Sequence, residues 1–189
     1  MELISNPFPL WQIALSWFII FPMTHPLVIQ LRFARSEFVR CLAGISDEDA
    51  RKRLLPMNCI SWMVGHLATQ EQFYWVYLAQ GKLVQPHLYE LVGYGRPAST
   101  PPLDEMWRAW RDVTAAADEF LETIAPEMMT TYLTQGDNQS RESVGTMLQR
   151  TIYHYWFHTG EAYAVRQQLG HVDLPEFVGD MSAAVYRSS

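Results

Sequence analysis

Apolar residues recur at steps of three and four along four stretches of the chain, residues 24–43, 58–80, 100–125 and 143–169. Side chains at this spacing lie on one face of an α-helix, so each stretch predicts a helix with one buried side and one solvated side. No stretch alternates convincingly between apolar and polar residues, as a half-buried strand does. The pattern therefore predicts an all-α fold, a four-helix bundle.

Residues at the ends of these stretches suit helix starts and stops. Asn58 and Thr100 carry side-chain oxygens that can cap a helix N-terminus, and Pro101 fits a first turn. The expected stops are Gly44, Gly81, Pro126 and Gly170. Between the second and third helices, residues 82–102 form a connection rich in proline and glycine, and a loop of this length could cover a site.

The first 22 residues differ from the rest of the chain. Residues 6–21 carry no charge, and residues 10–21 are almost wholly apolar. This run is too short to span a bilayer, and no Lys or Arg precedes it as in a signal peptide. We therefore expect residues 1–22 to form an apolar N-terminal extension of a domain over residues 23–189. The extension is either an extra helix or an upstream addition to a gene that starts at Met23, in preference to a membrane anchor.

Composition and charge narrow the class of protein. The 189 residues suffice for one domain, and the 49% hydrophobic and 13% aromatic content is typical of a packed globular protein. The net charge is −6 with acids and bases interleaved, so neither nucleic-acid binding nor a polybasic membrane contact is expected. Two cysteines, Cys41 and Cys59, make no disulfide framework and favour a cytoplasmic location with reduced thiols. Cys59 lies near a helix start that could lower its pKa, but burial is the preferred interpretation.

The chemistry that stands out is a histidine pair, His154 and His158, in the last predicted helix. Residues four apart lie one turn above each other on the same helix face. At 100° per residue, Met147, His154, His158, Glu161 and Val165 fall within roughly 60° of one another. The two imidazoles are therefore expected to point into the bundle.

A third imidazole, His66, lies on the apolar face of the second predicted helix, in a stripe that includes Trp62 and Phe73. Three histidines from packed helices would give a divalent ion three neutral nitrogens and leave one coordination position open. The alternative is that His66, and equally the pair, are hydrogen-bonded core residues without a metal.

Two further residues of the last helix have open roles. Glu161 could orient a histidine, act as a general base beside a metal, or form an ion pair with Arg150 or Arg166. Gly160 lies in the middle of the helix, where glycine is unfavourable by about 1 kcal/mol relative to alanine. Its presence there predicts close approach of another backbone.

The combined pattern resembles the DinB/YfiT-like superfamily. The matching motifs are NCISWMVGHL at residues 58–67 and YHYWFHTGE at residues 153–161, followed by residues 166–171 and 175–179. The resemblance runs from about residue 24 to the C-terminus and leaves out the first 22 residues. It implies an up-down-down-up four-helix bundle that holds a divalent metal ion through three histidines, which by position are His66, His154 and His158.

The resemblance also implies a function. Family members of known activity use the metal to activate low-molecular-weight thiols, as transferases or isomerases, and often form homodimers. The expected protein is a metal-dependent thiol S-transferase or hydrolase that attacks a small electrophile, with Glu161 as the candidate catalytic residue. Zinc or nickel is the expected metal, with iron or manganese as alternatives. A non-catalytic metal-binding or stress-response module is the competing interpretation.

Overall fold

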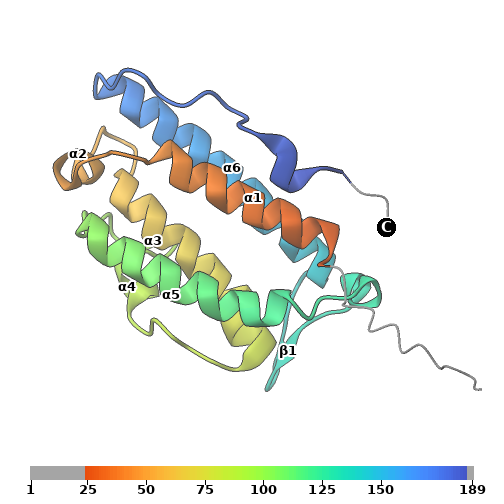
Figure 1. The fold of residues 1–189 in the computed structure, drawn as a ribbon. Coiled ribbons are helices and arrows are strands. Elements are labelled where there is room, and N and C mark those ends of the chain that lie inside the picture. Colours follow the sequence, from red (N-terminus) through yellow and green to blue (C-terminus); the bar gives the residue numbers. More distant parts are fainter. Residues whose placement is uncertain (1–23, 187–189) are drawn as a thin grey trace, which may run out of the picture.

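Four long helices form the framework of the computed structural model, which describes residues 24–186 (Figure 1). They are α1 (Pro26–Cys41), α3 (Ile60–Glu71), α5 (Leu103–Leu121) and α6 (Val144–Gln168). In Figure 1, α1 and α6 run in one direction, while α3 and α5 run in the opposite one. Helix α1 packs on α6 and α3 packs on α5. The predicted all-α bundle with up-down-down-up order is confirmed, whereas the apolar segment 1–22 lies outside the described residues.

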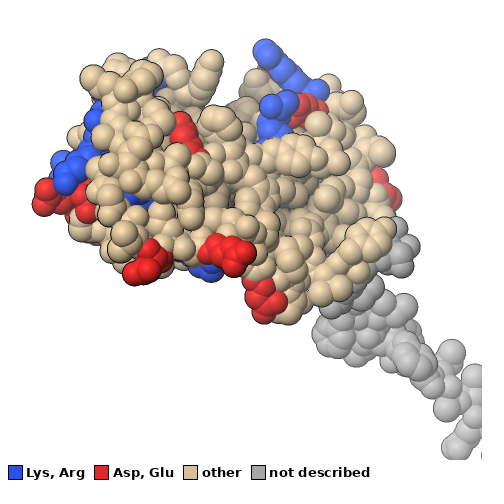
Figure 2. All heavy atoms as spheres, turned by 90° about the horizontal axis from the view of Figure 1, so that it is seen from above, with Lys and Arg blue, Asp and Glu red and all other residues tan. Residues whose placement is uncertain are grey.

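Short elements connect the long helices. Helix α3 continues without a break into the π-helical segment η1 (Gln72–Leu78). The remaining elements of the described part are α2 (Asp47–Arg51), α4 (Leu88–Val92), η2 (Pro126–Thr130), β1 (Thr134–Gln135), β2 (Asn138–Gln139) and η3 (Met181–Ala184). Strands β1 and β2 pair antiparallel as a small hairpin before α6. On the face shown in Figure 2, basic and acidic atoms lie around the periphery and uncharged residues fill the middle.

Helix α6 follows the sequence pattern closely. Its N-cap is Ser143, whose hydroxyl accepts a hydrogen bond from the backbone N–H of Thr146. Beyond its end lies Gly170 with φ +82°, a left-handed conformation that favours glycine. The residues expected on its apolar side are all buried: Val144, Met147, Leu148, Thr151, Tyr155, Ala162 and Val165.

Two expected N-caps are wrong. Helix α3 begins after Cys59, and Asn58 does not cap it. Helix α5 begins at Leu103, and its first backbone N–H donates to Asp47 Oδ1 of α2 at 2.8 Å. The cap of α5 therefore comes from a residue distant in sequence rather than from Thr100, because α2 packs against the start of α5.

The π-helical segment η1 changes which residues face the core. A π turn holds more residues than an α turn, so side chains after it are rotated relative to an α-helical stripe. Phe73, expected on the buried stripe, is 51% exposed. Trp75 and Val76 are fully buried in its place.

The close approach expected at Gly160 occurs instead at Gly65. A Cβ atom on Gly65 would lie 2.5 Å from Met106 Sδ and 2.9 Å from Val92 Cγ2, so α4 and α5 pack directly on this turn of α3. Gly160 is exposed, and a Cβ atom there would meet nothing within 4 Å. Within the single chain, the prediction of close approach at Gly160 is therefore wrong.

These two glycines give a matched stability prediction. Gly160→Ala is expected to raise the free energy of unfolding by up to about 1 kcal/mol, because alanine is the better helix former and the site has room. In Gly65→Ala the same gain in helix propensity is opposed by a destabilisation of about 1–3 kcal/mol from overpacking. No net stabilisation is therefore expected. Urea denaturation of both variants measures the difference. Equal changes at the two positions would contradict the packing described here.

A buried polar network ties the helices together. The Arg35 guanidinium of α1 forms an ion pair with Glu71 of α3, whose side chain is fully buried. Tyr155 of α6 donates to Glu71 Oε1 at 2.6 Å and accepts from Trp110 Nε1 at 2.7 Å. Burial and the Glu71 carboxylate raise the pKa of Tyr155, so its hydroxyl remains a donor. The network fixes α6 against α3.

Cys41 and Cys59 are both free thiols and both buried, as expected. Burial raises the pKa of Cys41 to about 11, and this keeps it a neutral thiol at physiological pH. No helix among residues 24–186 is both long and apolar enough to cross a membrane.

Candidate metal centre

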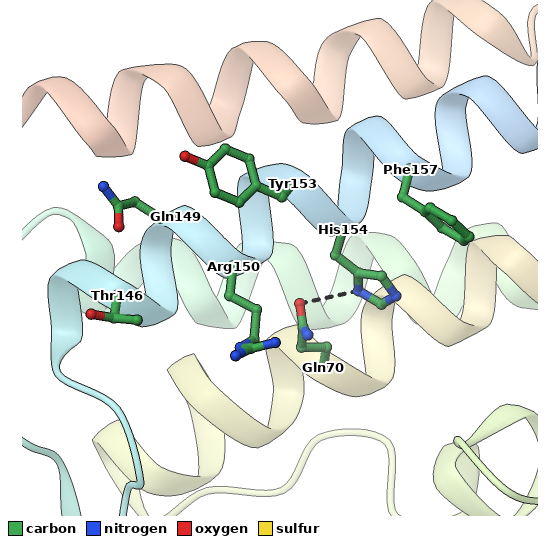
Figure 3. Close-up of a pocket in the computed structure, with 7 residues that line it drawn as sticks. All are labelled: Gln70, Thr146, Gln149, Arg150, Tyr153, His154 and Phe157. Carbon is green, nitrogen blue, oxygen red and sulfur yellow. Dashed lines mark hydrogen bonds between the residues drawn. The ribbon is translucent and has the colours of Figure 1, made fainter.

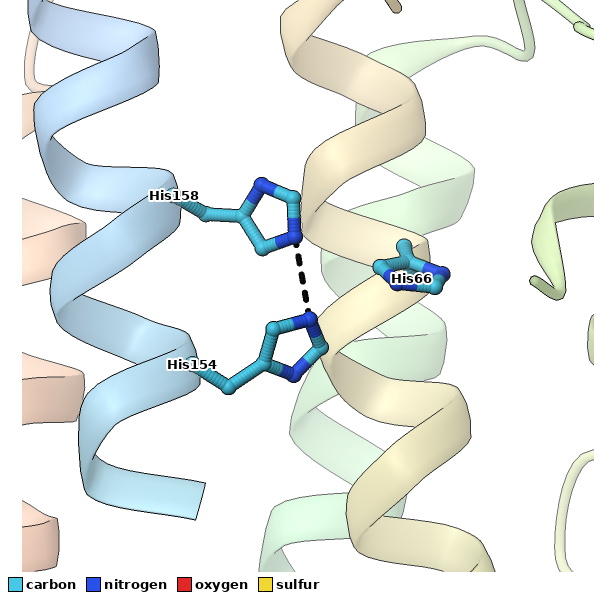
Figure 4. A group of neighbouring side chains, drawn as sticks. All are labelled: His66, His154 and His158. Carbon is cyan, nitrogen blue, oxygen red and sulfur yellow. Dashed lines mark hydrogen bonds between the residues drawn. The ribbon is translucent and has the colours of Figure 1, made fainter. Parts of the chain in front are cut away.

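His66, His154 and His158 come together between α3 and α6. His154 and His158 project from successive turns of α6 toward His66 on α3 (Figure 4). One ring nitrogen from each lies within 4.8 Å of the others. His66 stands nearly perpendicular to the other two rings, with ring centroids 5.0 Å from His154 and 5.4 Å from His158. His66 and His158 are buried, and His154 is partly exposed.

Each imidazole is held through its Nδ1 atom by an oxygen acceptor. His66 Nδ1 lies 2.9 Å from the carbonyl oxygen of Val92 in α4. His154 Nδ1 lies 3.1 Å from Gln70 Oε1. His158 Nδ1 lies 2.7 Å from Glu161 Oε2. Because these oxygens only accept, each Nδ1 carries a proton, and in a neutral ring the Nε2 atom then has a free lone pair.

The Nε2 atoms of His154 and His158 lie only 3.0 Å apart. Two lone pairs at this distance repel each other unless a proton or a cation lies between them. Metal-binding histidines usually donate their other ring N–H to a carboxylate, a carbonyl or water, as all three do here. The donor set therefore fits a divalent ion bound by three imidazole nitrogens.

The protein environment favours the neutral imidazole at His66 and at His154. Burial, opposed by the hydrogen bond to Val92, lowers the pKa of His66 to about 4. Burial, with repulsion from His158 and His66, lowers the pKa of His154 to about 3. These two rings are thus unprotonated at neutral pH, which is the form that ligates metals.

The lowered pKa values predict how the stability of the metal-free protein depends on pH. An unfolded histidine has a pKa of about 6.5, so below that value the unfolded chain binds more protons than the folded chain does. The free energy of unfolding should therefore fall as the pH drops from about 6.5 toward the folded pKa of His66, about 4. Urea denaturation at several pH values measures this slope.

The His66→Gln variant is the control for that slope, because the carboxylates that also titrate in acid are unchanged in it. Its stability should fall less steeply over the same pH window. Identical slopes for the variant and the wild type would contradict a neutral, buried His66.

Neighbouring residues support the three rings. The Trp62 indole stacks on His66, with ring centroids 4.2 Å apart and planes 16° apart. Glu161 does not pair with Arg150, which bonds Glu142, or with Arg166, which donates to backbone carbonyls of residues 41 and 43. Of the three roles considered for Glu161, the structure thus shows contact with a histidine.

A cavity of about 490 Å³ adjoins the centre on the side of His154. Its lining includes Gln70, Arg150, Tyr153, His154 and Phe157 (Figure 3). In Figure 3 the Gln70 amide lies between the Arg150 guanidinium and the His154 ring, to which it is hydrogen-bonded. A small molecule in the cavity can therefore reach a face of one of the three histidines.

The profile of the DinB superfamily matches residues 30–162, which include all three histidines. The chain belongs to the DinB superfamily. A comparison with curated proteins gives no match. The family assignment made from the sequence motifs is confirmed, and membership in the DinB superfamily together with the histidine cluster fits metal binding.

The sequence pattern indicates the three histidines but not the groups that hold them. Gln70 could have been assigned, since it lies four residues after His66 and therefore on the same face of the helix. The Val92 carbonyl could not, because it belongs to α4, a short helix within the connection between residues 82 and 102 that has no marked sequence pattern. This connection contacts the centre through the Val92 carbonyl.

Proposed function

We propose that the protein is a metal-dependent enzyme that activates a low-molecular-weight thiol, or water, toward a small electrophilic substrate. His66, His154 and His158 would hold a divalent ion, zinc or nickel in preference to iron or manganese. The observation that carries the proposal is that one ring nitrogen from each of the three histidines lies within 4.8 Å of the others, beside a cavity that His154 lines. A site that serves structure alone is usually closed by a fourth protein ligand. Among residues 24–186, no Cys, Asp or Glu joins the three histidines in this cluster.

The three neutral ligands suit this chemistry. When bound, a divalent ion supplies Lewis-acid chemistry that lowers the pKa of a thiol or a water molecule. Imidazole ligands leave the full positive charge of the ion available, since they are uncharged. The Nδ1 contacts hold each ring in one orientation, so the donor set is ordered before the ion arrives.

Glu161 is assigned a positioning role in this proposal. Its carboxylate accepts the Nδ1 proton of His158 and so fixes the tautomer that presents Nε2 to the ion. A general base would need an oxygen directed at the substrate cavity, and the Glu161 contact is directed at His158 instead.

A metal that stabilises or senses is the alternative. One observation favours it: His66 lies on α3 and the other two histidines lie on α6, so an ion would cross-link two helices of the bundle. In that case metal removal should lower the melting temperature sharply while the protein shows no turnover.

The experiment compares metal-loaded protein, chelator-treated protein and His158→Ala. Each is assayed with a panel of cellular thiols, and with water alone, against a chloronitrobenzene and an activated ester. The proposal predicts turnover by the loaded protein only. A loaded protein that turns over no combination of the panel, yet loses thermal stability on chelation, would overturn the catalytic proposal in favour of the alternative.

We further propose that the protein is a cytoplasmic homodimer that does not bind nucleic acid. The groove lined by the partly buried aromatic residues Trp156, Tyr163 and Phe177 supports self-association, because apolar surface of this kind is frequent at subunit interfaces. Sedimentation equilibrium should give twice the chain mass of 21.9 kDa. A monomer at micromolar concentration would contradict the dimer.

A further inference from the structure

A second and larger cavity adjoins the first. Its volume is about 840 Å³, and it extends from Gln70 and Arg150, which also line the first cavity, toward η1 and the β1–β2 hairpin. Gln70 and Arg150 are therefore walls of both cavities. We call the second cavity the hairpin groove. Its size is that of a pocket for a small organic molecule.

One wall of the hairpin groove is aromatic. Phe73, Tyr74 and Tyr77 line it from η1. Phe73 and Tyr77 stack with ring centroids 6.2 Å apart and planes 20° apart. The π-helical geometry turns these rings out of the core, and π turns inside helices are frequent at functional sites. The wall thus offers flat apolar surface to a ligand.

The opposite part of the groove is basic. Arg141 and Arg150 line it together with Glu142. Arg150 is bonded to both carboxylate oxygens of Glu142, so this pair is nearly neutral as a unit. Arg141 is exposed and makes no ion pair with any residue in the range 24–186. The groove therefore holds one uncompensated guanidinium beside its aromatic wall.

We propose that the hairpin groove binds a small molecule that carries a carboxylate on a flat apolar body. The carboxylate lies at Arg141, with Arg150 beside it, and the apolar body lies against Phe73 and Tyr77. This inference rests on the proposed function in one respect: the bound molecule would be the substrate of the metal centre, since Gln70 and Arg150 also line the cavity beside His154. It names the substrate class that the centre would act on.

The residues that line the groove favour a ligand with a carboxylate and a flat apolar body. Arginine presents a planar set of donors that matches a carboxylate in a bidentate geometry. The aromatic wall gains from burial of a flat apolar surface and from ring stacking. The pair of Arg150 and Glu142 is partly exposed, so it is held weakly enough for a ligand carboxylate to share the Arg150 donors.

The test is a binding measurement on the full-length protein, with and without metal. The probes are naphthoate and its neutral amide, naphthamide, titrated by calorimetry. Naphthoate is expected to bind about 10-fold or more tightly than naphthamide, as one charge-assisted hydrogen bond would give. In Arg141→Gln this preference should be reduced, because Arg150 is then the remaining guanidinium beside the carboxylate, whereas Phe73→Ala should weaken both probes alike. Arg111→Gln, at an exposed position of α5 away from the groove, is the matched control and should leave both affinities unchanged.

Equal binding of the two probes, or a preference that is unchanged in Arg141→Gln, would overturn recognition of the carboxylate at Arg141. Failure of both probes to bind would overturn the groove as a ligand site. Neither result depends on metal or on turnover, because binding is measured directly in the metal-free protein as well. A failure of the catalytic proposal would appear instead in the turnover assay and leave these affinities in place.

Discussion

His158→Ala is expected to lower the affinity for zinc by more than about 100-fold. Loss of a hydrogen-bond partner behind a metal ligand typically costs 10–100-fold in affinity, and loss of the ligand itself should cost more. His158 supplies one of three ring nitrogens that lie within 4.8 Å of one another. Its removal also leaves the Glu161 carboxylate without its hydrogen-bond partner. Competition with a chromophoric chelator measures the dissociation constant directly.

Two further variants test whether the loss of zinc affinity is specific to ligation by His158. Glu161→Gln keeps a hydrogen-bond acceptor but removes the charge behind His158, so an intermediate loss of about 10-fold is expected. His87→Ala makes the same substitution at an exposed histidine before α4 and should leave the affinity unchanged. Equal affinities of His158→Ala and His87→Ala would contradict ligation by the pair.

Arg35→Met is expected to lower the free energy of unfolding by about 3–5 kcal/mol, the cost of breaking a buried ion pair from one side. The substitution leaves the fully buried Glu71 carboxylate with Tyr155 as its remaining side-chain donor. Chemical denaturation with urea measures the loss, and metal-free protein should be used so that ligand binding does not add to it.

The surface pair of Lys82 and Glu119 provides the control, since both side chains are more than half exposed. Lys82→Met should cost less than about 1 kcal/mol. The double variant Arg35→Met with Glu71→Leu should recover much of the loss, because no unpaired charge then remains buried. A loss in Arg35→Met no larger than in Lys82→Met would contradict the stabilising role of the network.

The sequence was sufficient for the helices whose boundaries and faces are set locally. Ser143 and Gly170 mark the ends of α6, and its apolar stripe is buried as the three- and four-residue spacing predicts. The positions of His154 and His158 on the inner side of this helix follow from the same spacing. His66 could be placed on an inward face for the same reason.

The features that sequence reasoning missed depend on contacts between distant residues. The cap of α5 comes from Asp47, and no local pattern around Leu103 indicates it. The π turn in η1 moves Phe73 to the surface, although the apolar spacing of the segment continues as in an α-helix. In the sequence, Arg35 and Glu71 look like solvated residues of amphipathic helices. The structure shows that they form a buried ion pair.

The two mid-helix glycines also show that close packing cannot be predicted from the sequence of one helix. Gly65 and Gly160 are alike as mid-helix glycines, and only packing separates them. At Gly65 the side chains of Val92 and Met106 occupy the space of a Cβ atom, while at Gly160 the space is empty. Which glycine permits close approach is therefore decided by the neighbouring helices and not by the helix that contains it.

Metal ligation through three Nε2 atoms is tested most directly by NMR of protein loaded with a spin-active cadmium isotope, with histidine isotopically labelled. The structure predicts scalar coupling of the metal to the Nε2 atoms of His66, His154 and His158, and protonated Nδ1 atoms in all three rings. Coupling through Nδ1, coupling to fewer than these three histidines, or no coupling at stoichiometric cadmium would contradict the proposed centre.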